Sequence, residues 1–374
     1  MEKSQSNIHP FLCNFVDEIY DLHAEESMDL RNYLIQKQIL TQKRYSDAQV
    51  LIITNKYDLE ADLVGIHLLK RGIDYVRLNI DELTDFFRVS GYVSNGSEPK
   101  FLCSSRGIDI DLTHIAVVFL RNYDLSALKI GRNMLDYIFS IQQWENALIS
   151  LEGSLRCPWL NSYNVNKRAS DRMKQLSLAS KYGFSVPSSL ITNDPETAKE
   201  FYHLNNGEVM IKCLYHHRID IQEKAYSIYT RRVLEKDLNM FHALAAAPCI
   251  LQQKLKKTFE LRVHVIEDTV HSIRMKPPTE SYDDIHRYQF QDLKMELMSL
   301  PENISEMCRK IIDSLGLKYG AIDLVIDEKD DFQFLEVNAT PDWLWVERNV
   351  PIPITESMVG LIEKHSANGH KDGN

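Results

Sequence analysis

Two adjacent segments near the C-terminal end of the chain constrain the fold more than any other feature. Residues 319–327 (YGAIDLVID) form an apolar run rich in β-branched side chains, and residues 332–341 (FQFLEVNATP) alternate around Leu335 and Val337. The acidic stretch DEKDD, which joins them, favours a turn. The two segments therefore predict a β-hairpin.

The predicted hairpin brings three oxygen-bearing side chains together. Because side chains alternate along a strand, Glu336 and Asn338 share one face, and a turn near Lys329 places Asp323 opposite Glu336. Two carboxylates and an amide on a dry sheet are costly unless a cation binds there, and these hard oxygen ligands suit Mg²⁺ held together with substrate phosphates. The alternative is that a backbone group or an arginine satisfies Asp323 while Glu336 faces solvent.

Composition narrows the class of protein. A chain of 374 residues is long enough for two or three domains, each with its own core. The sequence has no apolar run of membrane-spanning length, no signal-peptide pattern and six scattered cysteines without a CxxC pair, which indicates a cytoplasmic protein with no membrane partner. The net charge of -10 argues against nucleic acid as the main partner.

The N-terminal half predicts an α/β domain. Residues 11–43 have the apolar spacing of one or two amphipathic helices, which could pack on the body or on another subunit. After them, strands at residues 50–54 and 75–79 flank a helix at residues 58–70, a βαβ unit that implies a parallel sheet. The first strand lacks a following glycine fingerprint, which excludes a Rossmann-type dehydrogenase. Further strands are expected at residues 89–94, 100–105 and 115–122, before a long helix.

The C-terminal half predicts antiparallel strands. In the strand at residues 208–213, Lys212 either reaches water at the strand end or meets an anion in a cleft. In the strand at residues 259–266, charged and apolar side chains alternate, and we expect Arg274 of the next strand to lie in register with the charged ones. We interpret this charged face as the wall of a cleft and not as a solvated face. One strand is expected at residues 225–231, and successive antiparallel strands are expected at residues 250–255, 259–266 and 270–275.

From residue 47 to residue 364, the order of these segments resembles the ATP-grasp superfamily, and within it the RimK-like peptide maturases that form ester or amide cross-links in microviridin-type (graspetide) precursors. Five segments carry the resemblance: the hairpin with Asp323, Glu336 and Asn338, the pair Gln252-Gln253, the run Lys257-Thr-Phe-Glu-Leu-Arg262, the strand lysine Lys212, and the tryptophan-rich residues 343–347.

The resemblance implies an α/β fold, α+β in its C-terminal half, in which a pre-ATP-grasp βαβ domain precedes an ATP-grasp fold with nucleotide between two β-layers. The domains expected on this basis are an N-terminal helical extension at residues 1–46, a pre-ATP-grasp α/β domain at residues 47–156, an ATP-grasp domain at residues 157–366 with a lid subdomain at about 185–250, and a disordered tail at residues 367–374.

The resemblance also implies a site for ATP and Mg²⁺. The metal ligands would be Asp323, Glu336 and Asn338. The nucleotide contacts would be Arg172, or Lys174 close by, with Lys212, Gln252, Gln253, Lys254, Leu255, Lys257 and Glu260. The catalytic groups would be Lys212, Arg262 and Arg287, whose charges suit phosphates and oxyanions. The sequence departs from the family pattern in three places. Arg172 stands where the family has lysine, Ile285-His-Arg287 replaces its Asp-Trp-Arg, and Ala339 and Pro341 follow Asn338 where the family often has proline and then glycine.

The activity implied by the resemblance is that of an ATP-dependent carboxylate ligase, which activates Asp or Glu side chains of a ribosomal precursor peptide as acyl-phosphates and closes ester or amide cross-links. The leader segment of that peptide is expected to dock on residues 214–224 and 234–244, near Arg218, Arg231 and Arg232. A second copy of the chain is a further possible partner.

Two alternatives remain open. One is a RimK-like ligase that adds amino acids to a small molecule or a protein terminus. The other is a non-catalytic nucleotide-binding protein, which would require a broken metal site.

Overall fold

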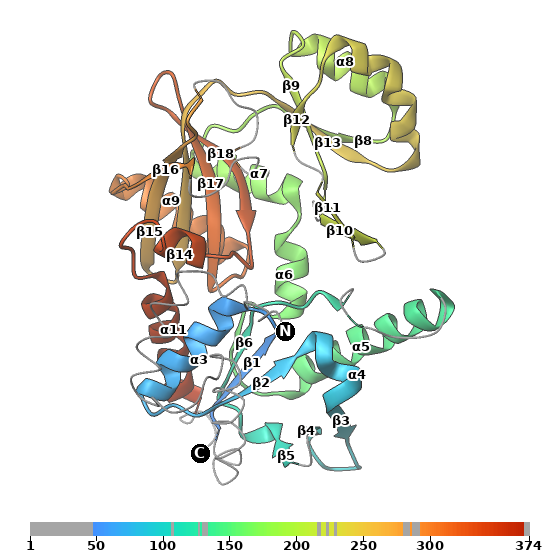
Figure 1. Ribbon diagram of the computed structural model, residues 1–374, viewed down its shortest axis with the longest axis vertical. Coiled ribbons are helices and arrows are strands. Elements are labelled where there is room, and N and C mark those ends of the chain that lie inside the picture. The colour runs from blue at the N-terminus through green and yellow to red at the C-terminus, as the bar shows by residue number, and fades with distance from the viewer. Residues whose placement is uncertain are drawn as a thin grey trace, which may run out of the picture. The chain divides into compact units, whose positions relative to one another are not determined.

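The computed structural model describes residues 48–105, 108–125, 128, 134–214, 218–221, 224–227, 230–279, 285 and 292–369 (Figure 1). The expected N-terminal extension lies outside them. The chain forms two compact units: the first runs to Tyr163 and also takes in Asp342–Arg348 and the chain from Pro353 onward, and the second contains Asn164–Pro341 and Asn349–Ile352. The domain boundaries expected from the sequence stay predictions. Among the described residues, no helix is long and apolar enough to cross a membrane.

The first unit is built on a four-stranded parallel sheet in the order β2-β1-β6-β7. Its apolar strands pack into one core with the small antiparallel sheet β3-β4-β5 and with helix α5. Helix α11 packs against α3, and Arg71, the C-cap of α3, forms ion pairs with Glu356 and Glu363 of α11. The elements are β1 (Val50–Thr54), α3 (Leu59–Lys70), β2 (Tyr75–Asn79), η2 (Ile80–Glu82), α4 (Leu83–Phe86), β3 (Phe87–Tyr92), β4 (Lys100–Ser105), β5 (Ile108–Asp111), η3 (Leu112–His114), β6 (Val117–Leu120), α5 (Met134–Ser154), β7 (Trp159–Leu160), α10 (Leu344–Glu347) and α11 (Ile354–Gly369).

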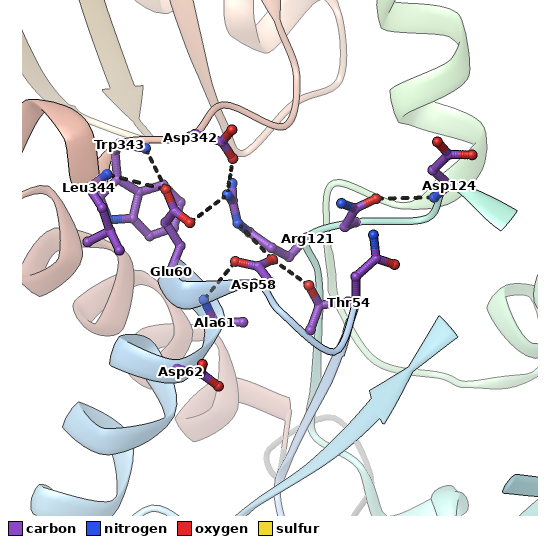
Figure 2. A network of polar contacts seen from close by, with 12 residues as sticks. Thr54, Asp58, Glu60, Ala61, Asp62, Arg121, Asp124, Asp342, Trp343 and Leu344 are labelled. Carbon is purple, nitrogen blue, oxygen red and sulfur yellow. Dashed lines mark hydrogen bonds and ion pairs between the residues drawn. The ribbon is translucent and has the colours of Figure 1, made fainter. Parts of the chain in front are cut away.

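A buried arginine joins the strand ends of the first unit to its C-terminal segment (Figure 2). Arg121, only 3% exposed, follows β6 directly. Its Nε lies 3.3 Å from Oδ2 of Asp58, and its Nη2 lies 3.5 Å from Oε2 of Glu60 and 2.5 Å from Oδ1 of Asp342. Asp58 is the N-cap of α3 and accepts the backbone N–H of Ala61. Three carboxylates therefore surround one guanidinium.

The pKa values of Glu60 and Asp58 shift in opposite directions in this cluster. Burial, and then the charges of Asp58 and Asp342, raise the pKa of Glu60 to about 7, although Arg121 opposes the shift. Burial also acts to raise the pKa of Asp58, but Arg121 and a hydrogen bond from Thr54 outweigh it and lower that pKa.

The pKa of Glu60 predicts a pH-dependent stability. A carboxyl whose pKa is raised by folding stabilises the fold fully below its unfolded pKa of 4.5, and this contribution is lost as the pH rises through about 7. Glutamine stays neutral, so Glu60→Gln does not lose this contribution. The free energy of unfolding of Glu60→Gln minus that of the native chain should therefore rise by about 3 kcal/mol from pH 4.5 to pH 8. Urea denaturation of both proteins at both pH values measures this difference, and the same difference at the two pH values would contradict the prediction.

The second unit contains two larger antiparallel sheets and a hairpin. One face of the five-stranded sheet β16-β15-β14-β17-β18 packs on helices α7 and α9, and one face of the four-stranded sheet β12-β9-β13-β8 packs on α8 and η5. The elements are α6 (Tyr163–Ala169), α7 (Arg172–Tyr182), β8 (Ser189–Thr192), α8 (Pro195–Leu204), β9 (Val209–Lys212), β10 (Arg218–Ile221), β11 (Lys224–Ser227), β12 (Arg231–Arg232), η5 (Glu235–Ala246), β13 (Cys249–Gln253), β14 (Lys257–Ile266), β15 (Thr269–Lys276), β16 (Lys294–Leu297), α9 (Glu302–Ser314), β17 (Tyr319–Asp327) and β18 (Phe332–Asn338).

The structure corrects the expected strand arrangement in two places. Residues 250–255 do not pair with β14, because β13 pairs with β8 and β9 and ends at Gln253. The run 225–231, expected as one strand, divides between β11 and β12. Residues 228–229 lie outside the described chain, and β12 pairs with β9 instead of continuing the hairpin.

The predicted hairpin is present as β17 and β18, with one irregularity. Asp323 pairs with Glu336, as expected, but Leu324 pairs with Phe334, so Leu335 is an extra residue at a β-bulge. Phe334 is fully buried and packs in the core with Val337, whereas Leu335 is only partly buried. The expectation that Leu335 and Val337 face the core together was therefore wrong for Leu335, because a bulge reverses the alternation of side chains.

The bulge predicts that two neighbouring apolar residues differ in their contribution to stability. Phe334→Ala removes a fully buried ring and should lower the free energy of unfolding by about 3–5 kcal/mol, whereas Leu335→Ala should cost clearly less, about 1 kcal/mol. Urea denaturation of the two variants gives the comparison. A larger loss for Leu335→Ala would mean that the strand lacks the bulge.

Candidate functional site

Charged and polar side chains lie in two adjacent rows across three strands of the five-stranded sheet. In one row, Arg262 of β14 pairs with Asp323 of β17, which pairs with Glu336 of β18. In the next row, His264 occupies the position beside Ala321, and Ala321 pairs with Asn338. Since paired residues share a face, the three predicted metal ligands lie on the face opposite to the helix-packed core.

The charged face of β14 is buried, so it is not a solvated surface. Glu260, Arg262 and His264 are 8%, 7% and 2% exposed. The expected neighbour Arg274 is not part of this face, because it pairs with the core residue Leu261. Arg274 instead bonds to Glu296 and stacks on a phenylalanine ring on the other face.

Both predicted carboxylate ligands are paired with arginines. Arg262 donates from Nη1 to Oδ1 and Oδ2 of Asp323 at 2.8 and 2.9 Å. Arg172, the first residue of α7, places Nη1 3.2 Å from Oε2 of Glu336. The interpretation that an arginine satisfies Asp323 is thus what the structure contains, and its role as a metal ligand stays a prediction.

The donor chemistry of this face fits a magnesium ion held jointly with phosphates. Among the described residues, no group of three or more His, Cys, Asp or Glu is arranged to hold a metal, so two carboxylates and one amide would need ligands from the substrate. Arg262 Nε is buried and has no hydrogen-bond partner within the described chain. A buried donor without an acceptor is suited to bind an oxyanion next to a metal ion held at this face.

A buried glutamine, not identified from the sequence, fixes the strand that carries two of these ligands. Gln175 of α7 accepts the backbone N–H of Val337 at 2.9 Å and donates to its carbonyl oxygen at 3.0 Å. Val337 lies between Glu336 and Asn338, so this amide holds the edge strand as a neighbouring strand would. The sequence did contain a signal for this residue, because Gln175 lies on the apolar side of the helix that begins at Arg172.

The candidate nucleotide residues of the four-stranded sheet share one face. Lys212 pairs with Ile250, and Gln252 lies two residues further along β13 on the same side, opposite to the sheet's core face. Gln252 is 3% exposed and donates to the hydroxyl of Ser189 at 3.0 Å. Lys212 ends its strand, and its ammonium has no ion pair within the described residues, which leaves its charge available for an anion.

The remaining nucleotide candidates are distributed differently from what we expected. Gln253 is exposed, and Lys254 and Leu255 lie in the link between β13 and β14 instead of in a strand. Lys257 donates to Glu260 at 2.6 Å. Lys174 is exposed, so of the two alternatives Arg172 is the one beside a predicted metal ligand. Arg287 lies outside the described residues.

Two arginines of the expected leader dock are paired with acids. Arg231 pairs with Asp237 at 2.7 Å, and Arg232 pairs with Glu208 at 2.5 Å. Arg218 begins β10, but its side chain is outside the described part of the structure, as is much of residues 214–224. The segment expected as the helix 234–244 is the 3₁₀ helix η5.

Comparison with known proteins gives three kinds of likeness: to a family profile, to sequence relatives and to solved structures. A sequence profile described as a RimK-like ATP-grasp domain matches residues 169–362. A probable alpha-L-glutamate ligase from Citrobacter koseri is 23% identical over 216 residues, which cover 55% of this chain and 69% of the relative.

Two solved structures are similar over most of the chain, each with a TM-score of 0.75. One is a RiPP-associated ATP-grasp ligase from Chryseobacterium gregarium in complex with ADP and a leader and core peptide, 24% identical, covering 85% of this chain and 97% of that one. The other is the macrocyclase MdnC of Microcystis aeruginosa bound with precursor peptide MdnA, 22% identical, covering 84% and 98%. These likenesses confirm the expected α/β fold with its ATP-grasp half.

The ion pair of Asp323 predicts a structural cost that Glu336 does not share. Asp323→Ala leaves the buried Arg262 charge without its partner and should lower the free energy of unfolding by about 3 kcal/mol. Glu336→Ala breaks a pair whose side chains are 26% and 30% exposed, and should cost about 1 kcal/mol or less. Urea denaturation without nucleotide compares them, and equal losses would contradict the assignment.

Proposed function

Because the chain belongs to the RimK-like ATP-grasp family, we propose that it is an ATP-dependent ligase that activates side-chain carboxylates of a ribosomal precursor peptide and closes ester or amide cross-links. The observation that carries the proposal is the row formed by the buried Arg262 and the partly buried Asp323 and Glu336, with Arg172 beside its end. Such a row offers carboxylates for a cation and arginines for oxyanions on one face.

Some of the site residues would bind the phosphates of ATP, and others would bind the substrate carboxylate. When bound, Mg²⁺ neutralises charge on the β- and γ-phosphates, and Asp323, Glu336 and Asn338 would hold it. Lys212 would neutralise phosphate from the neighbouring sheet. Arg262 would orient the acyl-phosphate. Its Nη1 donates to Asp323, and its planar guanidinium has further donors, among them the buried Nε, that could donate to an oxyanion.

The arginines give the site a way to keep its carboxylates neutralised at every stage. Two carboxylates on one partly buried face repel each other unless a cation accompanies them. Arg262 and Arg172 supply that charge in the structure. Mg²⁺ held by Asp323 and Glu336 would supply it in their place, and each guanidinium could then donate to the substrate.

A peptide substrate is supported by the closeness of the structural match. The two peptide-bound ligases each match with a TM-score of 0.75. A D-Ala:D-Ser ligase from Enterococcus faecalis, covered to a similar extent, matches with a TM-score of 0.50. We therefore keep amino-acid addition as the second candidate and propose a cytoplasmic, peptide-modifying enzyme as the first.

The test combines ATP turnover with the mass of the peptide. We expect Mg²⁺-dependent release of phosphate in the presence of the short peptide encoded beside the gene, and a loss from that peptide of one water mass for each bond formed. Glu336→Ala should abolish both, whereas Glu328→Ala should not, because Glu328 lies exposed in the turn of the same hairpin.

Other outcomes assign the protein differently. A gain in peptide mass by whole amino acids would favour the amino-acid ligase. No nucleotide binding by the native chain would overturn the ligase assignment.

A further inference from the structure

Two of the scattered cysteines lie next to each other on neighbouring strands of the second unit. β9 and β13 are adjacent in the four-stranded sheet (Figure 1), and their antiparallel register pairs Lys212 with Ile250. Cys213 directly follows Lys212, and Cys249 directly precedes Ile250. The next pair in the same register is therefore Cys213 with Cys249. The fold thus brings together two thiols that the sequence keeps far apart.

The two thiols also share one face of the sheet. Side chains alternate along a strand, so Cys213 continues the face of Ile211, and Cys249 lies on the face of Leu251. Ile211, Leu251 and Cys249 all contribute to the core that lies between this sheet and helices α8 and η5. Lys212 lies on the opposite face. The cysteine pair is thus on the core side of the sheet, at the end of its two central strands.

The pKa values of these thiols give a second indication that they are close. Burial raises the pKa of Cys213. Burial and then the negative charge of the Cys213 thiolate raise the pKa of Cys249, and such an effect requires that the two sulfur atoms lie near each other. By contrast, burial alone raises the pKa of Cys103 and of Cys157. Both members of the pair are free thiols and only partly buried.

The backbone spacing of such a pair suits a disulfide. Paired residues of antiparallel strands have Cα atoms about 4.5–5.5 Å apart. A disulfide joins residues whose Cα atoms are about 4.4–6.8 Å apart, so the bond can form without separating the strands. In a reducing compartment, disulfides are typically transient and sense the redox state instead of supporting the fold permanently.

We propose that Cys213 and Cys249 form a reversible disulfide and are a redox-sensitive modification site of the four-stranded sheet. The bond would join the end of β9 to the start of β13, directly after the phosphate candidate Lys212. The inference concerns residues of the second unit alone and does not depend on the proposed function.

Glutathione disulfide, a low-molecular-weight disulfide, would be the oxidant. One protein thiolate attacks a sulfur atom of glutathione disulfide, which gives a mixed disulfide and releases one glutathione thiolate. The second protein thiolate attacks the cysteine sulfur of the mixed disulfide, which forms the bond between Cys213 and Cys249 and releases the second glutathione. The two protein thiols are oxidised, glutathione disulfide is reduced, and the two glutathione molecules carry away the two protons.

The test incubates the reduced full chain with glutathione disulfide, alkylates the remaining thiols in denaturant and maps the peptides by mass spectrometry. Cys213→Ser and Cys249→Ser each remove one member of the pair. Cys157→Ser is the matched control, because Cys157 is also a partly buried free thiol but lies in the first unit. Circular dichroism verifies that each variant is folded.

We expect the native chain to yield one cross-linked peptide pair that contains Cys213 and Cys249, lighter than its reduced form by two hydrogen atoms. Excess reduced glutathione should reverse the change. Each variant of the pair should instead retain one glutathione on its remaining thiol, because no second thiol can displace it. Cys157→Ser should form the cross-link as the native chain does.

The rate of cross-linking should rise about 10-fold from pH 7 to pH 8. Only the thiolate reacts, and its fraction grows with pH because the pKa values of both thiols are raised. The same mapping at the two pH values, with samples quenched in acid at intervals, gives the rates.

Three results would overturn the proposal. Glutathione on both cysteines of one native chain, without a cross-link, would mean that the two sulfur atoms are not within bonding reach. A cross-link that forms only in denaturant would mean that the fold keeps the thiols apart. Thiols that stay reduced in the folded chain but react in denaturant would mean that the sheet does not admit the oxidant. None of these results concerns nucleotide binding, so the proposed function is tested separately.

Discussion

The β-bulge at Leu335 is the constraint on which the candidate site depends. Without it, Phe334 and Glu336 would lie on the same face of β18, and either an aromatic ring would leave the core or a carboxylate would enter it. The extra residue reverses the alternation between them. The hairpin can therefore bury Phe334 against the helices and still present Glu336 and Asn338 to the opposite face.

Both units contain arginines paired with carboxylates. In the second unit Arg262 and Arg172 each meet one carboxylate, whereas in the first unit one guanidinium meets three. The balanced pairs suit a face that exchanges counterions during a reaction. The unbalanced cluster instead raises the pKa of Glu60 and suits a place where chain segments are held together.

The sequence predicted the positions of strands and helices better than it predicted which strands pair with each other. The hairpin, the βαβ unit and the pairing of Asp323 with Glu336 follow from alternation and turn chemistry, which are local. The assignment of β13 to a separate sheet depends on hydrogen bonds with β8 and β9, and the position of Arg274 depends on ladder register. Neither is encoded in apolar periodicity.

Long-range contacts explain why some buried polar pairs were missed. Arg121 and Asp342 are 221 positions apart, and Gln175 and Val337 are 162 apart. Each contact satisfies a buried polar group, but a single sequence does not indicate which distant residue supplies the partner. A glutamine or an arginine inside an apolar pattern shows only that some partner must exist.

Arg172 connects these elements, because one atom of its side chain reaches more than one acceptor. Its Nη1 lies 3.2 Å from Glu336 and 3.4 Å from both the Gln175 amide oxygen and the Val337 carbonyl oxygen. Two of these acceptors belong to β18, and the third is the amide that bonds the same strand at Val337. Arg172 and Gln175 therefore tie the start of α7 to β18 at the residues predicted to bind the metal.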